Sequence, residues 1–253
     1  MSDKNNKFSQ LEKYIFAHRG FHDKPLIPEN SMPAFRRAGE RGFGAELDIH
    51  LMKDGRLAVI HDACLRRTAH ADVFIEDLCA EDLPQYHLEE SSETIPLLED
   101  VLELGLPLIV ELKCERGNAA ALSEAAWNAL KDYPAPWCME SFDPRAVFWF
   151  AKHHPEVCRG QLSENFFRNP EVELPGYQKW ILTRLLGNIF CRPDFVAYQF
   201  EDRDNPYLRR YLQNGGREAS WTIRKREDLE AALRAGSIPI FECFDPSGKE
   251  EKA

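Results

Sequence analysis

The sequence predicts an α/β fold, a (β/α)8 or TIM barrel built from a single domain. The chain has 253 residues, close to the roughly 250 that such a barrel uses. Short apolar segments alternate with helical segments, and strands are expected near residues 15, 48, 110, 138, 160, 198, 221 and 241. Strands separated by helices imply right-handed parallel crossovers. The alternative, an open doubly wound sheet, would carry a glycine-rich dinucleotide motif, which this sequence lacks.

The barrel begins with a strand–helix–strand unit. Apolar residues 14–17 predict a short first strand. Asn30 or Ser31 is expected to cap a helix that runs to about Glu40. Glycines then break this helix before the strand that contains Glu46.

A β-hairpin is expected directly after the start of the second strand. Glu46, Asp48 and His50 alternate with apolar residues, and this period of two is typical of a strand. Asp54-Gly55 predicts a two-residue turn, which would pair Asp48 with His61. Directly opposite residues point to the same face, so His61 should stand beside the two carboxylates. A register slip of one residue would undo this placement.

The rest of the chain continues the alternation of helix and strand. Residues 51–93 are the least regular part and hold the hairpin and a charged stretch, whereas residues 1–12 are expected to form a polar N-terminal tail. Helices are predicted over residues 97–104, 118–130, 174–186, 205–212 and 227–235, with one more from residue 143, and strands over 108–111, 137–139, 157–162, 195–200, 218–223 and 238–244.

Composition limits the possible partners and compartments. The net charge of −10 argues against nucleic acid and anionic membranes as default partners. No apolar run is long enough for a signal peptide or a transmembrane segment. The seven cysteines are scattered, odd in number and without a close C-x-x-C pair, so reduced thiols and a cytoplasmic location are expected. The oligomeric state stays open.

Polar residues gather at the carboxyl ends of the predicted strands. Active sites of barrel enzymes occupy this face, so residues far apart in the sequence should converge on one pocket. The residues at these strand ends are His18, Glu46, Asp48, Glu111, Lys113, Ser141, Gln161, Trp221 and Glu242.

Three of these residues are carboxylates suited to a divalent cation. Glu46, Asp48 and Glu111 supply hard oxygen ligands, which Mg²⁺ and Ca²⁺ prefer. Apolar neighbours suggest that these strands are buried, and buried carboxylates are costly unless a cation neutralises them. We therefore expect one divalent cation, Mg²⁺ or Ca²⁺, at this site.

Cationic and aromatic residues complete a site for cleaving a phosphate ester. Arg19 has a planar fork that matches phosphate oxygens, and Lys113 adds a point charge or holds a neighbouring carboxylate in place. His18 and His61 are expected to form an acid–base pair. Trp221 either offers an apolar wall to the substrate or packs in the barrel core.

The order and spacing of these motifs resemble the signature of the glycerophosphodiester phosphodiesterase family. The resemblance covers nearly the whole chain, is densest up to Lys113, and rests on His18-Arg19-Gly20, Pro28-Glu29-Asn30-Ser31, Glu46-Leu47-Asp48, Lys53-Asp54-Gly55, His61-Asp62, Glu111-Leu112-Lys113, Ser141-Phe142-Asp143 and Trp221-Thr222-Ile223. It implies metal-dependent hydrolysis of a small-molecule glycerophosphodiester to glycerol 3-phosphate and an alcohol. It also implies that residues 51–93 form an excursion over the barrel mouth.

Two other functions remain open at this point. A lysophospholipase D would use the same chemistry on a single-tailed lipid and would need an apolar groove, to which Phe166, Phe167, Trp180 and Phe190 could contribute. A noncatalytic barrel could bind a phosphoester as a sensor, although pure binding does not require two histidines for proton transfer.

The end of the chain departs from the family pattern. Phe241-Glu242-Cys243 replaces the usual threonine–aspartate segment, which puts the alcohol side of the substrate in doubt. The sequence leaves open the preferred head group, the choice between Mg²⁺ and Ca²⁺, and the assignment of acid and base to the histidines. The nucleophile could be water or the glycerol 2-hydroxyl.

Overall fold

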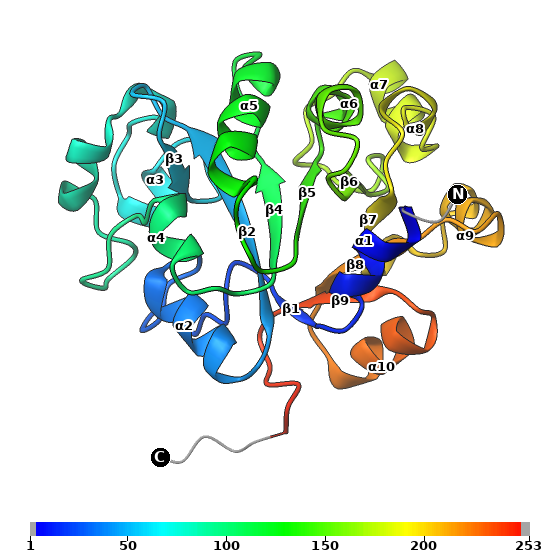
Figure 1. Ribbon diagram of the computed structural model, residues 1–253, viewed down its shortest axis with the longest axis horizontal. Helices are drawn as coiled ribbons and strands as arrows, with labels where there is room; N and C mark the ends of the chain where they lie inside the picture. The colour runs from blue at the N-terminus through cyan, green and yellow to red at the C-terminus, as the bar shows by residue number, and fades with distance from the viewer. Residues whose placement is uncertain (1–3, 249–253) are drawn as a thin grey trace.

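The computed structural model describes residues 4–248, and the side chains of residues 7–248. Eight parallel strands form a closed barrel, because the first strand pairs with both the second and the last. Figure 1 shows the helices distributed around the outside of these strands. The barrel strands are β1 (Phe16–Ala17), β2 (Gly44–Leu51), β4 (Leu108–Leu112), β5 (Trp137–Ser141), β6 (Arg159–Ser163), β7 (Phe195–Gln199), β8 (Glu218–Ile223) and β9 (Ile238–Phe241). The predicted (β/α)8 barrel is therefore confirmed.

Helices form between the strands where the sequence predicts them, and the structure has further helical segments that were not predicted. The α-helices are α1 (Lys4–Leu11), α2 (Met32–Glu40), α3 (Arg66–Ala69), α4 (Leu98–Leu102), α5 (Ala119–Leu130), α6 (Pro144–His153), α7 (Gly176–Thr183), α8 (Asn188–Cys191), α9 (Pro206–Gln213) and α10 (Arg226–Arg234). Short side chains start several of them: Ser31 accepts a hydrogen bond from the Ala34 amide, and Asp143 accepts one from Arg145. The predicted helix over 174–186 is shorter than expected and is followed by a separate turn of helix, α8.

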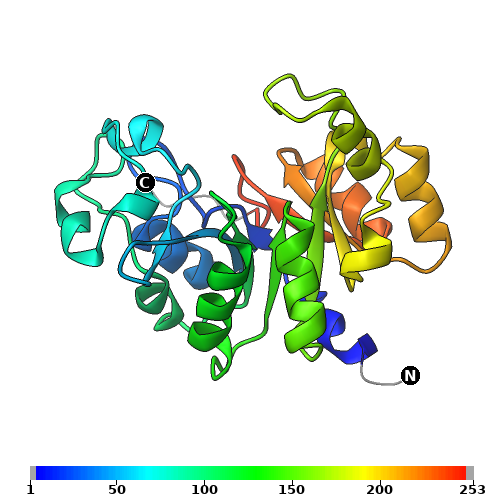
Figure 2. The ribbon, with the colours of Figure 1, turned by 90° about the horizontal axis from the view of Figure 1, so that it is seen from above.

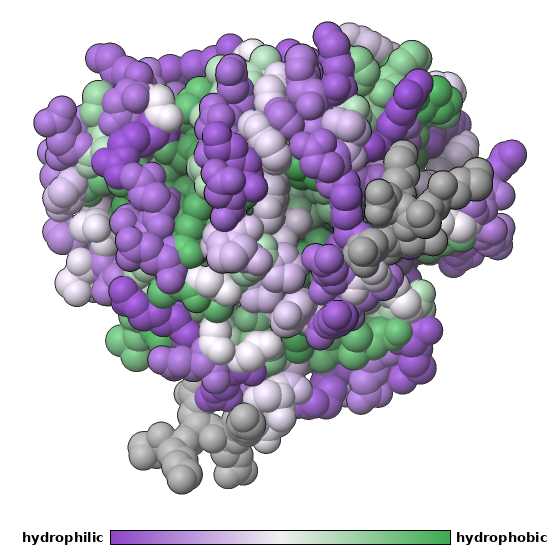
Figure 3. Space-filling view, viewed as in Figure 1, coloured by the Kyte–Doolittle hydropathy of each residue, from purple (hydrophilic) through white to green (hydrophobic). Residues whose placement is uncertain are grey.

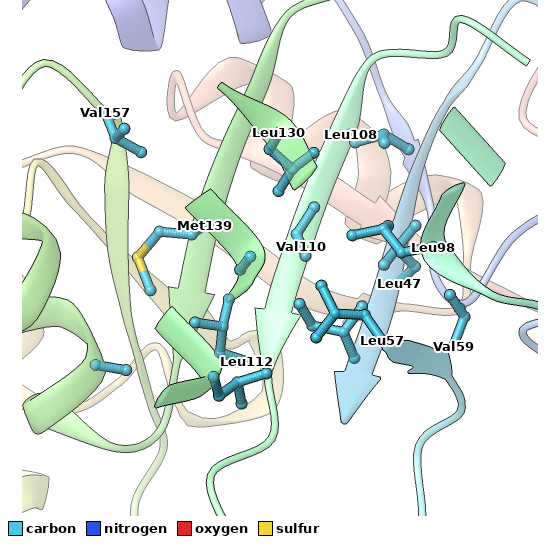
Figure 4. Packing of buried hydrophobic residues seen from close by; sticks show 14 of the residues in the cluster. Leu47, Leu57, Val59, Leu98, Leu108, Val110, Leu112, Leu130, Met139 and Val157 are labelled. Carbon is cyan, nitrogen blue, oxygen red and sulfur yellow. The ribbon is translucent and has the colours of Figure 1, made fainter. Parts of the chain in front are cut away.

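The space between strands and helices holds the largest hydrophobic core. Leu47, Val110 and Met139 project from neighbouring strands (Figure 4) and belong to one cluster with residues of α5 and α6, such as Ala126 and Phe150. Every residue of β4 is buried, which explains its continuous apolar run. This layer fixes the strands that carry the polar residues at their carboxyl ends.

The barrel interior changes character along its axis. Ile109 and Cys138 belong to an apolar cluster inside the barrel, whereas Glu111 and Glu140, two residues further along the same strands, are buried polar residues. Residues two apart in a strand share a face. The interior is therefore apolar toward the amino ends of the strands and acidic toward their carboxyl ends.

The predicted polar tail over residues 1–12 is wrong for the part that the structure describes. Residues Lys4–Leu11 form α1, and Phe8 and Leu11 are buried in the interior cluster. The Phe8 ring lies 5.2 Å from the ring of Phe195. An apolar pair at i and i+3 lies on one face of a helix, and this signal was overlooked among the lysines and asparagines. Residues 1–3 lie outside the described part of the chain.

The hairpin forms, but its predicted register is wrong by one residue. The antiparallel strand β3 (Leu57–Val59) pairs with β2 so that Ile49 lies opposite Val59. The loop contains three residues instead of two, because Gly55 adopts a left-handed φ of 85° and closes a longer turn. Asp48 is consequently not opposite His61.

The segment after the hairpin has a small core of its own. Leu65, Ile75, Leu83 and Leu88 are buried together in it, within a run of short helical turns that includes η1 (Ile75–Asp77) and η2 (Ala80–Gln85). Figures 1 and 2 show this segment, in cyan to teal, packed beside the barrel. It is an ordered insertion between β3 and α4.

Candidate active site

Three carboxylates meet on the neighbouring strands β2 and β4. Asp48 lies directly beside Glu111 in the parallel register of the two strands, and Glu46 precedes Asp48 on the same face. Single oxygens of Glu46, Asp48 and Glu111 all lie within 4.8 Å of one another. All three side chains are buried. The barrel thus holds three acids at close range inside a site with little contact to solvent.

The carboxylates differ in how strongly the surroundings favour ionisation. Burial, and then the charges of Asp48 and Glu111, raise the pKa of Glu46 well above its ordinary value. Burial also raises the pKa of Glu111, against the opposing effect of Lys113. Burial disfavours the charge of Asp48 too, but Lys113 and other cations outweigh it and lower the pKa of Asp48. Such a set is most stable as three anions when a cation lies among them.

Two basic residues border the acids. The Lys113 Nζ atom lies 3.1 Å from Asp48 Oδ1 and 2.8 Å from Glu111 Oε1. The Arg19 Nη1 atom donates to Glu29 Oε1 at 2.8 Å, and Arg19 Nε lies 3.5 Å from Asp48 Oδ2. Lys113 therefore holds its neighbouring carboxylates in place, and both cations bring positive charge to the cavity.

The three acids fit a divalent cation. Oxygen ligands of Mg²⁺ and Ca²⁺ lie about 2.0–2.6 Å from the ion, so two ligands of one ion are at most about 5.2 Å apart. The separations in this site fall within that limit. The ligand atoms are all carboxylate oxygens, which suits a hard cation better than zinc. Glu46, Asp48 and Glu111 are the residues that could hold the ion.

His18 follows β1 and is oriented by a carboxylate from the other end of the chain. Its Nδ1 atom lies 2.6 Å from Glu242 Oε2, and its Nε2 atom lies 3.9 Å from Glu46 Oε2. Burial, and next the charge of Arg19, lower the pKa of His18 to about 4. A neutral His18 that donates through Nδ1 to Glu242 has a free lone pair on Nε2.

His61 reaches the same cavity by a route other than the predicted pairing. The chain leaves the hairpin after Val59, and the Ile60 amide donates to the Asp48 carbonyl at 3.1 Å. His61 Nδ1 then lies 2.6 Å from Asp62 Oδ1. The ring of His50 contacts the His61 carbonyl oxygen at 3.1 Å. Each histidine of the predicted pair therefore has a carboxylate partner on Nδ1.

The predicted residues line one cavity of about 170 Å³. Its wall includes His18, Arg19, Glu46, His61, Glu111, Lys113, Glu140, Phe142 and Trp221. Trp221 packs edge-on against Phe142, with ring centroids 5.7 Å apart. Asp48 is not part of this wall, but it contacts Lys113, which is.

Sequence reasoning did not predict the roles of several residues that shape the site. Glu242 was expected at the end of the last strand, but its contact with His18 was not predicted. Asp62 directly follows His61, which is the available signal for its role. Glu140 sits beside Glu111 in the strand register, but the sequence offers no cue that its side chain faces the cavity.

A second, larger cavity adjoins the first. It measures about 660 Å³ and shares Glu111, Lys113 and Phe142 with the site. Its wall also carries apolar residues such as Phe166 and Leu182. Of the four residues proposed for an apolar groove, Phe166 lines this cavity, whereas Phe167 and Trp180 line a separate one and Phe190 a third.

A closed parallel barrel with acids, histidines and two cations at the carboxyl ends of its strands defines a barrel hydrolase of phosphate esters. The sequence profile of the glycerophosphoryl diester phosphodiesterase family matches residues 18–242. The chain belongs to this family, and it is a phosphoric diester hydrolase.

Individual relatives agree with this assignment. A glycerophosphodiester phosphodiesterase from Bacillus altitudinis is 50% identical over 174 residues, which cover 63% of this chain and 70% of the relative. One from Caldanaerobacter subterraneus subsp. tengcongensis is 27% identical over 237 residues, covering 89% and 92%. A phosphodiesterase of Oleispira antarctica, solved in complex with the product sn-glycerol-3-phosphate, has the same fold, with a TM-score of 0.74, 22% identity and coverage of 90% and 92%.

Proposed function

We propose that the protein hydrolyses glycerophosphodiesters to glycerol 3-phosphate and an alcohol, with one bound Mg²⁺ or Ca²⁺. The observation that carries this proposal is that two carboxylate-paired histidines line the same cavity as Glu46 and Glu111, which form a tight cluster with Asp48. The solved relative with sn-glycerol-3-phosphate supports the choice of product.

In the proposed mechanism, the carboxylates and the basic residues bind the cation and the phosphate, and the two histidines transfer protons. When bound, the cation would neutralise the non-bridging phosphate oxygens and stabilise the charge that builds up during cleavage. Glu46, Asp48 and Glu111 would hold it. Arg19 and Lys113 add positive charge beside the phosphate, which is needed because the chain as a whole is acidic.

The surroundings of the two histidines favour different roles. His18 is buried with a lowered pKa, so it is neutral at pH 7 and suited to accept a proton on Nε2 as the general base. His61 is more exposed, and its Nδ1 atom lies 2.6 Å from Asp62 Oδ1, which orients the ring toward the leaving alkoxide, so we assign His61 the role of general acid. The proton that His18 accepts would come from water or from the glycerol 2-hydroxyl.

One assay tests the proposed function. Release of glycerol 3-phosphate should be measured by enzymatic coupling for choline, ethanolamine and other head groups, with and without chelator. We expect hydrolysis that stops on chelation and resumes with Mg²⁺ or Ca²⁺, because carboxylate oxygens are the only grouped ligands found in the described residues. Restoration by zinc alone would contradict the proposed site.

A lysophospholipase D activity is the second candidate, and the cavity of about 660 Å³ favours it. The apolar part of this cavity, which includes Phe166, Ile181 and Leu182, could take an acyl chain attached to the leaving or retained alcohol. Tyr177, Ile189 and Phe190 of α7 and α8 are exposed at the surface, in a region where Figure 3 shows hydrophobic residues, although Ile189 and Phe190 line a separate cavity. Release of choline from lysophosphatidylcholine, added to the same head-group panel, decides between the two substrates.

The two histidines argue against a noncatalytic phosphoester-binding barrel, because binding alone requires no proton transfer. None of the helices within residues 4–248 has the length and hydrophobicity needed to cross a membrane. The cytoplasmic location stays a prediction, which all seven cysteines support by being unpaired.

A further inference from the structure

Glu140 is a buried acid that the proposed mechanism does not use. It lies on β5 directly beside Glu111 of β4, its side chain is 1% exposed, and it lines the active-site cavity. Its Oε2 atom has no hydrogen-bond partner within the described part of the chain. Glu140 is also absent from the tight group of Glu46, Asp48 and Glu111 that could hold the cation.

The nearby cations are engaged with other acids. Lys113 contacts Asp48 and Glu111, and Arg19 contacts Glu29 and Asp48. Burial raises the pKa of Glu140 well above its ordinary value.

A buried carboxyl without a partner costs stability, so a bound ligand is the natural source of the missing partner. Because phosphate would be repelled by an acid, the partner should be a neutral group that donates a hydrogen bond. A hydroxyl can donate to Glu140 whether its carboxyl is ionised or neutral.

Trp221 could donate a second hydrogen bond to the same kind of group. Its Nε1 atom is buried without a partner in the described residues, and its ring lines the same cavity. An indole N–H can only donate, whereas a hydroxyl both donates and accepts. Glycerol carries hydroxyls that could satisfy both groups, and the larger neighbouring cavity leaves room for the other alcohol of the diester.

We propose that Glu140 and Trp221 bind the glycerol hydroxyls of the substrate and thereby select a polyol on one side of the phosphodiester. This inference rests on the proposed function and adds two specificity-determining residues to it. It assigns the phosphate to the side of Arg19 and Lys113 and the glycerol to the side of β5 and β8.

A binding comparison between two monoesters tests the proposal. Isothermal calorimetry should measure the affinity of the Mg²⁺-loaded protein for sn-glycerol 3-phosphate and for n-propyl phosphate, which has the same charge without the hydroxyls. We expect the wild type to prefer glycerol 3-phosphate by roughly 10–100-fold, the value of one or two hydrogen bonds to a charged group. Glu140→Leu should lose most of this preference while keeping its affinity for n-propyl phosphate.

Two conservative variants and one control make the test specific. Glu140→Gln keeps an accepting oxygen and should retain part of the preference, and Trp221→Phe keeps the ring but should lose part of it. Glu218→Gln alters a buried acid that pairs with Arg203 outside the cavity and should leave the preference unchanged. Thermal unfolding confirms that each variant is folded.

Three outcomes would overturn the proposal. If Glu140→Leu loses affinity equally for both esters, Glu140 contacts the phosphate. If the variant binds Mg²⁺ more weakly, Glu140 is a metal ligand. If the preference for glycerol 3-phosphate is unchanged, Glu140 does not contact the glycerol. Failure of the proposed function is distinguishable, because a wild type that hydrolyses no glycerophosphodiester can still show the binding preference. A wild type that binds neither ester would overturn both.

Discussion

At the scale of single residues, the site is controlled by carboxylates that orient histidines. Glu242 contacts Nδ1 of His18, and Asp62 contacts Nδ1 of His61. A partner on Nδ1 fixes the ring and directs Nε2 to the reacting atoms. In the proposed mechanism, this orientation would prepare the two histidines for proton transfer at opposite ends of the same phosphate.

Alanine variants should separate the roles of the two histidines. Each of His18→Ala and His61→Ala should lose about 10²–10⁴-fold in turnover, the range for one general acid–base group. Affinity for the substrate should change much less, because Arg19, Lys113 and the cation would hold the phosphate in the proposed site. With a leaving phenol of low pKa, which needs little protonation, His61→Ala should recover most of its rate and His18→Ala should stay slow. Equal recovery of both variants, or full activity of either on glycerophosphodiesters, would show that the two-histidine mechanism is wrong.

Glu29, in the Pro28-Glu29-Asn30-Ser31 motif, stabilises the folded protein beside the site by pairing with cations. It accepts hydrogen bonds from Arg19 and Arg67 at 2.8 and 2.7 Å and also pairs with Lys24. Although burial opposes its charge, these cations hold the pKa of Glu29 well below its ordinary value. Its stabilising effect is therefore present above the unfolded-state pKa of about 4.3 and declines as the pH falls toward the folded-state value.

The lowered pKa of Glu29 predicts how the stability of a Glu29 variant depends on pH. Glu29→Gln should lower the free energy of unfolding by about 1–3 kcal/mol at pH 7, because it removes charge-assisted hydrogen bonds to Arg19 and Arg67, although both cations keep a second carboxylate partner. The difference between variant and wild type should shrink when urea unfolding is repeated at a pH well below the unfolded-state pKa of the carboxyl. A difference that is independent of pH would mean that packing, not charge, accounts for the loss.

Residue identities were easier to predict from the sequence than their contacts. The grouping of Glu46, Asp48 and Glu111 follows from the alternation of side chains on parallel strands and from the barrel itself. The partnership of His18 with Glu242 spans 224 positions and depends on barrel closure, which places β9 beside β1. The unpartnered state of Glu140 depends on where neighbouring cations point, and no local pattern encodes that direction.

At the scale of elements, the hairpin shows the limit of turn rules. Asp54-Gly55 is typical of a two-residue turn, yet the Met52 amide pairs with the Arg56 carbonyl around a three-residue loop. Asp54 also accepts a hydrogen bond from the Ala80 amide in the insertion, so a tertiary contact favours the longer loop. His61 still reaches the cavity because the strand ends at Val59 and the chain turns there.

The N-terminal helix is the element for which stability gives the clearest prediction. Phe8 is fully buried against Phe195 in the barrel interior. Phe8→Ala should therefore lower the free energy of unfolding by about 3–5 kcal/mol, the usual cost of removing a buried aromatic ring. Lys7→Ala, on the same helix but only partly buried, is the matched control and should change it by less than about 0.5 kcal/mol. Chemical denaturation measures both, and equal effects would contradict the packing of this helix into the core.

At the scale of the whole molecule, the barrel gathers charge that the fold alone does not neutralise. Three acids meet at one end of the barrel, and a fourth, Glu140, lies beside them. Lys113 and Arg19 offset only part of this charge. Enzymes commonly carry such unfavourable groups at their sites, where a bound cation or substrate completes the balance.

This imbalance predicts opposite effects of one substitution with and without metal. Because the folded-state pKa of Glu46 lies above its ordinary value, its charge destabilises the metal-free protein at neutral pH. Glu46→Gln should therefore raise the metal-free melting temperature, by about 2–4 °C for each kcal/mol gained in a chain of this size. Saturating Mg²⁺ should stabilise the wild type by about 2.7 kcal/mol at 100 times its dissociation constant, and the variant should lose most of that gain. Differential scanning calorimetry with chelator and with Mg²⁺ measures both effects, with Glu218→Gln as a control that keeps the metal response. A variant that is less stable without metal, or that responds to Mg²⁺ as the wild type does, would exclude Glu46 as a metal ligand that carries uncompensated charge.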